Sequence, residues 1–79
     1  MDIKVLGTGC ANCKNTVTVI EQVAKARGAE IALTKVEEPR DIMAYGVMRT
    51  PSVVIEGRVV HAGGVPGRDQ VEAWFGAGA

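Results

Sequence analysis

Hydrophobic residues recur along the chain with two different spacings. A period of two, or a short continuous apolar run, is typical of a strand, and spacings of three and four are typical of a helix. Strand patterns occupy residues 2–6, 30–36, 52–55 and 58–62. Helical patterns occupy residues 10–27, 39–45 and 68–75. The chain is therefore predicted to be an α/β protein with the order βαβαββα.

These patterns also predict which side chains form the core. The long helix carries an apolar stripe made of Cys13, Val17, Ile20 and Ala24. The core candidates of the first strand are Ile3 and Val5. Those of the short middle helix are Ile42 and Met43, and those of the last helix are Val71, Trp74 and Phe75. Gly28 is expected to cap the carboxyl end of the long helix.

The connections between the segments determine part of the topology. The first strand, the long helix and the second strand form a unit with parallel strands and a right-handed crossover. The last two strands, which turn at Glu56-Gly57, form an antiparallel hairpin. Residues 1–79 therefore make one domain, and residues 76–79 are expected to be a frayed tail.

The charged residues do not alter the predicted fold, but they argue against some classes of binding partner. Nine basic and nine acidic residues give a formal net charge of zero, and the two signs are interspersed. Nothing in this distribution favours a nucleic acid or a membrane surface. The apolar run at the N-terminus is too short for a signal peptide, and no later run could span a membrane. We therefore expect a cytoplasmic protein, in a compartment where thiols are kept reduced.

The candidate chemistry lies in Cys10-Ala11-Asn12-Cys13, between a strand and a helix. The amides and dipole at the start of a helix favour a thiolate, so Cys10 is predicted to be the nucleophile in disulfide exchange. Cys13 begins the apolar stripe and is expected to lean toward the core, as the resolving cysteine. Gly9 lets the chain turn before the pair.

Two other functions remain open on the residues alone. A CxxC pair can bind a metal, and copper-binding modules of similar length carry one at a helix start. His61 is the only histidine, so a structural zinc set would be incomplete. The disulfide could instead switch the surface of an interaction domain. Two cysteines that are merely buried would be the simplest alternative.

Thr50-Pro51 precedes the third strand and has two interpretations. Proline lacks an amide donor and suits the entrance of a strand. Alternatively, it is a cis-proline that lies against the cysteine pair, although only about 5–6% of X-Pro bonds in folded proteins are cis.

Together, the segment Gly7-Thr8-Gly9-Cys10-Ala11-Asn12-Cys13, Thr50-Pro51 and the final hairpin with Gly63-Gly64 resemble the thioredoxin/glutaredoxin superfamily. The CANC motif is similar to that of its minimal archaeal and bacterial members, the small redox-active disulfide proteins. The resemblance implies a four-stranded mixed sheet flanked by three helices, with the first and third helices on one face. It also implies a protein-disulfide reductase that is a monomer without a bound cofactor or metal.

The resemblance also assigns roles to particular residues. It implies a Cys10–Cys13 disulfide that is reduced by a flavin-dependent enzyme like thioredoxin reductase and passes electrons to disulfide-containing proteins. Pro51 would be the cis-proline, and the Thr50 backbone would bond an extended substrate peptide. Gly9, Ala11 and Asn12 would shape the loop around the pair.

The sequence departs from ordinary thioredoxins at three places. Thr8-Gly9 stands before Cys10 in place of a tryptophan, and Asn12 replaces a proline. Lys4 occupies the position of a buried acid that aids proton transfer. Its charge is expected to point off the sheet, with an effect on a cysteine as the alternative. The reduction potential and the range of substrates are therefore left open.

Overall fold

The computed structural model describes residues 1–9 and 11–76 and has the predicted order of elements. The elements are β1 (Asp2–Leu6), α1 (Ala11–Ala26), β2 (Ala32–Val36), α2 (Pro39–Ala44), β3 (Ser52–Ile55), β4 (Arg58–Ala62) and α3 (Arg68–Gly76). In the part of the chain described, no helix is long and apolar enough to cross a membrane.

The four strands form one mixed sheet in the order β2-β1-β3-β4. β1 and β2 are parallel, with Ile3 opposite Leu33 and Val5 opposite Lys35. β3 runs antiparallel to both β1 and β4, which confirms the predicted hairpin. The carboxyl end of β1 therefore lies beside the carboxyl end of β2 and the start of β3, and this edge carries the candidate site.

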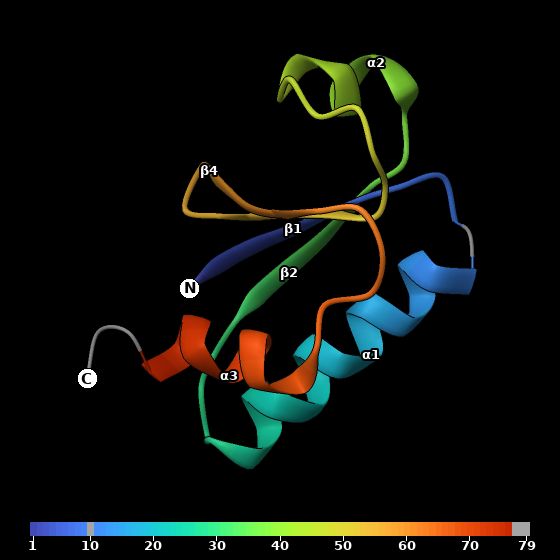
Figure 1. Ribbon diagram of the computed structural model, residues 1–79. Helices are drawn as coiled ribbons and strands as arrows, with labels where there is room; N and C mark the ends of the chain where they lie inside the picture. Colours follow the sequence, from blue (N-terminus) through green and yellow to red (C-terminus); the bar gives the residue numbers. More distant parts are fainter. Residues whose placement is uncertain (10, 77–79) are drawn as a thin grey trace.

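The helices cover the two faces of the sheet unequally (Figure 1). α1 and α3 pack on one face, and α2 lies on the other. The larger apolar cluster joins the sheet to α1 and α3 and consists of Ile3, Val5, Val17, Ile20, Val23, Val53 and Val71. A smaller cluster under α2 consists of Leu6, Ile42 and Val54. Alternation along β1 thus supplies both layers of the core.

The predicted apolar stripe of α1 is confirmed. Its four residues are buried, with exposed fractions of 6% for Cys13, 8% for Val17, 0% for Ile20 and 3% for Ala24. The helix ends as expected at Gly28, which has a φ of +65°. The Gly28 and Ala29 amides donate to Lys25 and Ala24, the pair of bonds that defines a Schellman cap.

Three details differ from the sequence prediction. Ile42 is buried, but the prediction for Met43 was wrong, because its side chain is 73% exposed. Neighbours in a helix point about 100° apart, so only one of the two can face the sheet. β2 begins at Ala32 rather than Glu30. Gly76 is the last residue of α3, and the rest of the predicted tail, residues 77–79, lies outside the described residues.

Replacing Ile20 by alanine is expected to destabilise the fold by about 2–5 kcal/mol, because it leaves a cavity at the centre of the larger cluster. Urea denaturation followed by circular dichroism measures the change in free energy. Gln22→Ala, at an exposed position of the same helix, is the control and should change stability by less than about 0.5 kcal/mol. Equal effects of the two changes would contradict the assigned core.

Candidate functional site

The site is built around a close approach of three segments at the end of β1. Cys13 lies in the first turns of α1, Gly7 follows β1, and Pro51 precedes β3. A Cβ atom added at Gly7 would overlap Cys13 Sγ and would lie 3.9 Å from the Pro51 Cα atom. Gly7 is itself buried. Because Gly7 has no side chain, the Cys13 sulfur can pack against the Gly7 backbone close to the Pro51 backbone.

The Thr50-Pro51 segment is held from both sides. Its peptide bond is cis. The buried Ser52 hydroxyl donates to the Arg49 carbonyl, and the Gly63 amide donates to the Pro51 carbonyl at 2.9 Å. Thr50 is exposed, and its backbone N–H and C=O have no hydrogen-bond partner within residues 1–9 and 11–76. Within the described residues, the Thr50 N–H and C=O are therefore both available for a ligand, next to the proline that lies near the Gly7–Cys13 contact.

The predicted cysteine pair is only partly described. Cys13 is buried and disulfide-bonded, while Cys10 lies outside the described residues. Ala11 and Asn12 are exposed in the first turn of α1, where the Asn12 carbonyl accepts a hydrogen bond from the Thr16 hydroxyl at 2.8 Å. Within the described residues, no group of three potential ligands could hold a metal ion.

The start of α1 has a positive electrostatic character. Its first-turn amides lack carbonyl partners within the helix, as at every helix start. The first turn contains no acidic residue, and Lys14 adds a positive charge close by. Both features favour an anion in front of the helix.

Lys4 lies on the face of the sheet opposite Cys13. It alternates with Ile3 and Val5, which face α1, and so it points to the side covered by α2. Its Nζ atom donates to Asp2 Oδ2 at 3.3 Å. That hydrogen bond, the charge of Asp2 and the nearby Tyr45 raise the pKa of the Lys4 amine above its ordinary value. Lys4 therefore interacts with Asp2 and Tyr45 rather than with the cysteine.

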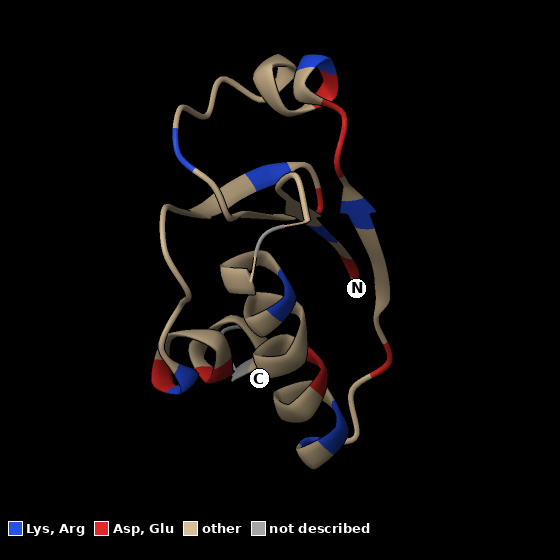
Figure 2. Cartoon of the chain, turned by 90° about the vertical axis from the view of Figure 1, so that its right-hand side faces the viewer, with Lys and Arg blue, Asp and Glu red and all other residues tan. Residues whose placement is uncertain are grey.

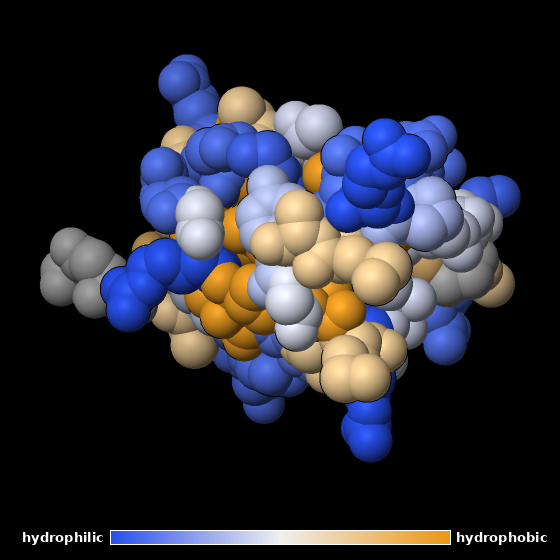
Figure 3. Space-filling view, turned by 90° about the horizontal axis from the view of Figure 1, so that it is seen from above, coloured by the Kyte–Doolittle hydropathy of each residue, from blue (hydrophilic) through white to orange (hydrophobic). Residues whose placement is uncertain are grey.

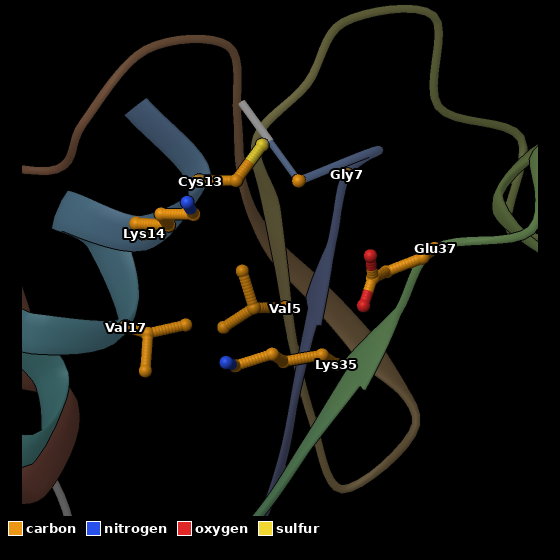
Figure 4. Close-up of a pocket in the computed structure, with 8 residues that line it drawn as sticks. Val5, Gly7, Cys13, Lys14, Val17, Lys35 and Glu37 are labelled. Carbon is orange, nitrogen blue, oxygen red and sulfur yellow. The ribbon is translucent and has the colours of Figure 1, made fainter. Parts of the chain in front are cut away.

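A small cavity of about 80 Å³ opens beside Cys13, on the side of β2 (Figure 4). Its apolar floor is formed by Val5 and Val17, and its rim carries Lys14, Lys35 and Glu37. These three charged residues were not predicted to belong to the site. The alternation of β2 could have placed Lys35 on the α1 face, because Ile31 and Leu33 share its parity, but Glu37 follows the end of the strand.

An apolar groove adjoins the site on the α2 side. It is lined by Thr8, Pro39, Ile42, Met43, Val47, Met48 and Thr50. Met48 is 98% exposed and Met43 73% exposed. The view onto α2 shows apolar side chains gathered on this face between hydrophilic residues (Figure 3). The groove runs from Thr8, in the loop before Cys10, to Thr50.

Gly7→Ala tests the close approach that builds the site. We expect the new methyl group to destabilise the reduced protein by about 1–3 kcal/mol, because it overpacks against the Cys13 sulfur. Urea denaturation in the presence of a reductant measures this cost.

The same Gly7 substitution made in a Cys13→Ala background provides the control, since the sulfur is then absent. The cost of the added methyl group should be clearly smaller in that background. An equal cost in both backgrounds would show that Cys13 Sγ is not the atom that excludes a side chain at Gly7.

Comparison with known proteins agrees with this geometry. The model of the thioredoxin domain family matches residues 1–76. A thioredoxin from Methanothermobacter thermautotrophicus is 26% identical over 91% of this chain and 94% of its own length. A thioredoxin from Methanocaldococcus jannaschii is 26% identical over 89% of this chain and 80% of its own length. The structure of thioredoxin 1 from the thermophilic eubacterium Thermosipho africanus superimposes with a TM-score of 0.57 at 20% identity, covering 99% of this chain and 98% of that one. The chain therefore belongs to the thioredoxin domain family.

Proposed function

We propose that the protein is a thiol–disulfide oxidoreductase that reduces disulfides in other proteins through Cys10 and Cys13. The Cys10 thiolate attacks one sulfur of the substrate disulfide, and the other sulfur leaves as a thiolate that takes up a proton. Cys13 then loses its proton and attacks Cys10 Sγ. The mixed disulfide breaks, the substrate leaves fully reduced, and a Cys10–Cys13 disulfide remains.

The observation that carries this proposal is the position of Cys13. Its sulfur is buried on the apolar stripe of α1 and lies against the backbone of Gly7, next to Pro51. A buried thiol is poorly accessible to a protein substrate but suited to an intramolecular attack. This supports the role of Cys13 as the resolving cysteine and leaves the first attack to Cys10.

The start of α1 supports the role of Cys10. The first-turn amides, which lack carbonyl partners within the helix, and the positive charge of Lys14 lie next to Cys10 in the sequence. Such an environment favours the thiolate over the thiol. Cys10 is therefore the cysteine whose reactive form is stabilised before a substrate arrives.

We further propose that an extended segment of the substrate lies over Thr50 and the apolar groove beside it. The unpaired N–H and C=O of Thr50 can bond the substrate backbone, as in strand addition. The groove continues from Thr50 past Met48 and Met43, whose flexible side chains adapt to different apolar partners. The substrate class is therefore proteins whose disulfide is flanked by apolar side chains.

The reducing equivalents are proposed to come from a flavin-dependent enzyme similar to thioredoxin reductase, which returns two electrons and two protons to the Cys10–Cys13 disulfide. On this proposal the protein holds no cofactor of its own and acts as a monomer. It would work in the cytoplasm, where the thiol pool keeps such a carrier reduced.

Substitution of the two cysteines tests the proposed order of attack. Cys10→Ser is expected to abolish the reduction of insulin disulfides, and Cys13→Ser should accumulate a mixed disulfide with the substrate. Insulin precipitation measures turnover, and mass spectrometry under non-reducing conditions detects the mixed disulfide. Full turnover by Cys10→Ser would rule out the proposed nucleophile.

Met48→Glu tests the substrate groove. We expect the KM for a disulfide-containing protein to rise about tenfold, because an apolar contact is replaced by a charge. The rate with a small aromatic disulfide, which is too short to reach the groove, should not change. Val60→Glu places the same charge at an exposed position of β4 and should affect neither substrate. A loss of activity toward both substrates in Met48→Glu would count against the groove.

A further inference from the structure

The proposed function requires a proton to leave Cys13 at the moment when its sulfur must attack. Cys13 is 6% exposed, its sulfur packs against Gly7, and it lines a cavity whose floor is formed by Val5 and Val17. Burial among apolar groups favours a neutral thiol over a charged thiolate. An efficient second step therefore needs a group near Cys13 that can accept this proton.

The cavity beside Cys13 contains one carboxylate among its lining residues within the described part of the chain, that of Glu37. Figure 4 shows this carboxylate directed into the space between Gly7 and Lys35. A Cβ atom added at Gly9 would lie 3.4 Å from Glu37 Oε2, so the carboxylate reaches the loop that leads to the cysteine pair.

The backbone before Glu37 is held in place. The Gly7 amide donates to the Val36 carbonyl at 2.9 Å, which continues the β1–β2 ladder by one residue. Glu37 therefore follows Val36, which is hydrogen-bonded to Gly7, and Gly7 packs against Cys13. The cavity volume of about 80 Å³ exceeds the roughly 15 Å³ that one water molecule needs. The cavity that Cys13 and Glu37 both line is therefore large enough to hold a water molecule.

The other charges around Cys13 come from two elements. Lys14 on α1 and Lys35 on β2 line the same cavity, and their positive charges favour the thiolate that forms there. Figure 2 shows the acidic segment that joins β2 to α2 next to the basic end of β2.

Several other charged groups of the neighbouring elements interact elsewhere. Lys4 and Asp2 of β1 pair on the opposite face of the sheet. Arg49 packs against Gly63, and His61 bonds Gly64 and lies near Trp74. Arg68 and Glu72 of α3 pair with each other.

We propose that Glu37 is the proton acceptor for Cys13, acting through water in this cavity. The inference rests on the proposed oxidoreductase function. The Cys13 thiol gives its proton to the Glu37 carboxylate, and its sulfur forms a bond with Cys10 Sγ. The bond between Cys10 and the substrate sulfur breaks, and the departing substrate thiolate receives the proton that Glu37 holds. No external oxidant or reductant takes part in this step.

The test separates the two steps in a single turnover. Reduced protein is mixed with a peptide disulfide, the reaction is quenched with acid at set times, and mass spectrometry counts the mixed disulfide. Glu37→Gln is expected to form the mixed disulfide at the rate of the unmodified protein and to resolve it about 100-fold more slowly at neutral pH. The difference should shrink as the pH rises well above neutral, because hydroxide can then take the proton that the glutamine cannot accept.

Glu38→Gln is the matched control. It removes the same charge one residue further along the chain. Glu38 precedes α2 without a side-chain capping bond, and it does not belong to the cavity lining described above. This variant should resolve the mixed disulfide at the normal rate, and equal slowing in both variants would show a general effect of charge and overturn the proposal.

The remaining outcomes distinguish this inference from the proposed function. Normal resolution by Glu37→Gln at every pH would overturn the role of Glu37, while trapping of the mixed disulfide by Cys13→Ser would still support the oxidoreductase. If neither the unmodified protein nor Cys13→Ser ever formed a mixed disulfide, the proposed function itself would fail.

Discussion

The rest of the site depends on the packing of the Cys13 sulfur against a backbone that carries no side chain. Gly7 ends β1, Cys13 belongs to α1, and Pro51 leads into β3. Because the added Cβ atom at Gly7 would occupy the place of the sulfur, the distance between α1 and the sheet at this end is set by this contact. The Pro51 backbone, which follows Thr50, lies next to the same contact. The Gly7 side of this contact has no side chain, so no rotamer change at Gly7 can relieve or shift it.

The sheet determines which charges can act on that sulfur. Successive residues of a strand point to opposite faces, so Lys4 and Val5 cannot both face α1. Lys4 is thereby directed to Asp2 and Tyr45 under α2. Lys35 is opposite Val5 in the parallel pair and so points to the α1 face. Lys4 aligns with the buried acid of ordinary thioredoxins, but the sheet separates its amine from Cys13. Lys35, which is distant from the cysteines in the sequence, lies on the same face of the sheet as Cys13.

Periodicity in the sequence predicted the elements and most of the core, because both depend on local patterns. The stripe through Ile20 and the strand Ser52–Ile55 were found in this way. Met43 was misplaced because a helix of six residues has too few turns for a pattern to establish its buried face. The contact of Gly7 with Cys13 and Pro51 could not be predicted from the residues, since it depends on how three elements meet. A glycine that permits a turn and a glycine that permits a close approach look the same in a sequence.

The charged rim of the cavity lies at the edge of the sheet because the apolar core extends as far as the cavity floor. Val5 and Val17 belong to the larger apolar cluster and also form the floor of the cavity. The site therefore continues the core to the end of the sheet, and a charged group cannot approach from below without being desolvated. β2 is an edge strand, so side chains at its end can reach the cavity while their charged heads remain in contact with water. In a domain with a single sheet, a carboxylate at this edge can accept a proton from a buried thiol and still remain hydrated. Its desolvation therefore costs little stability.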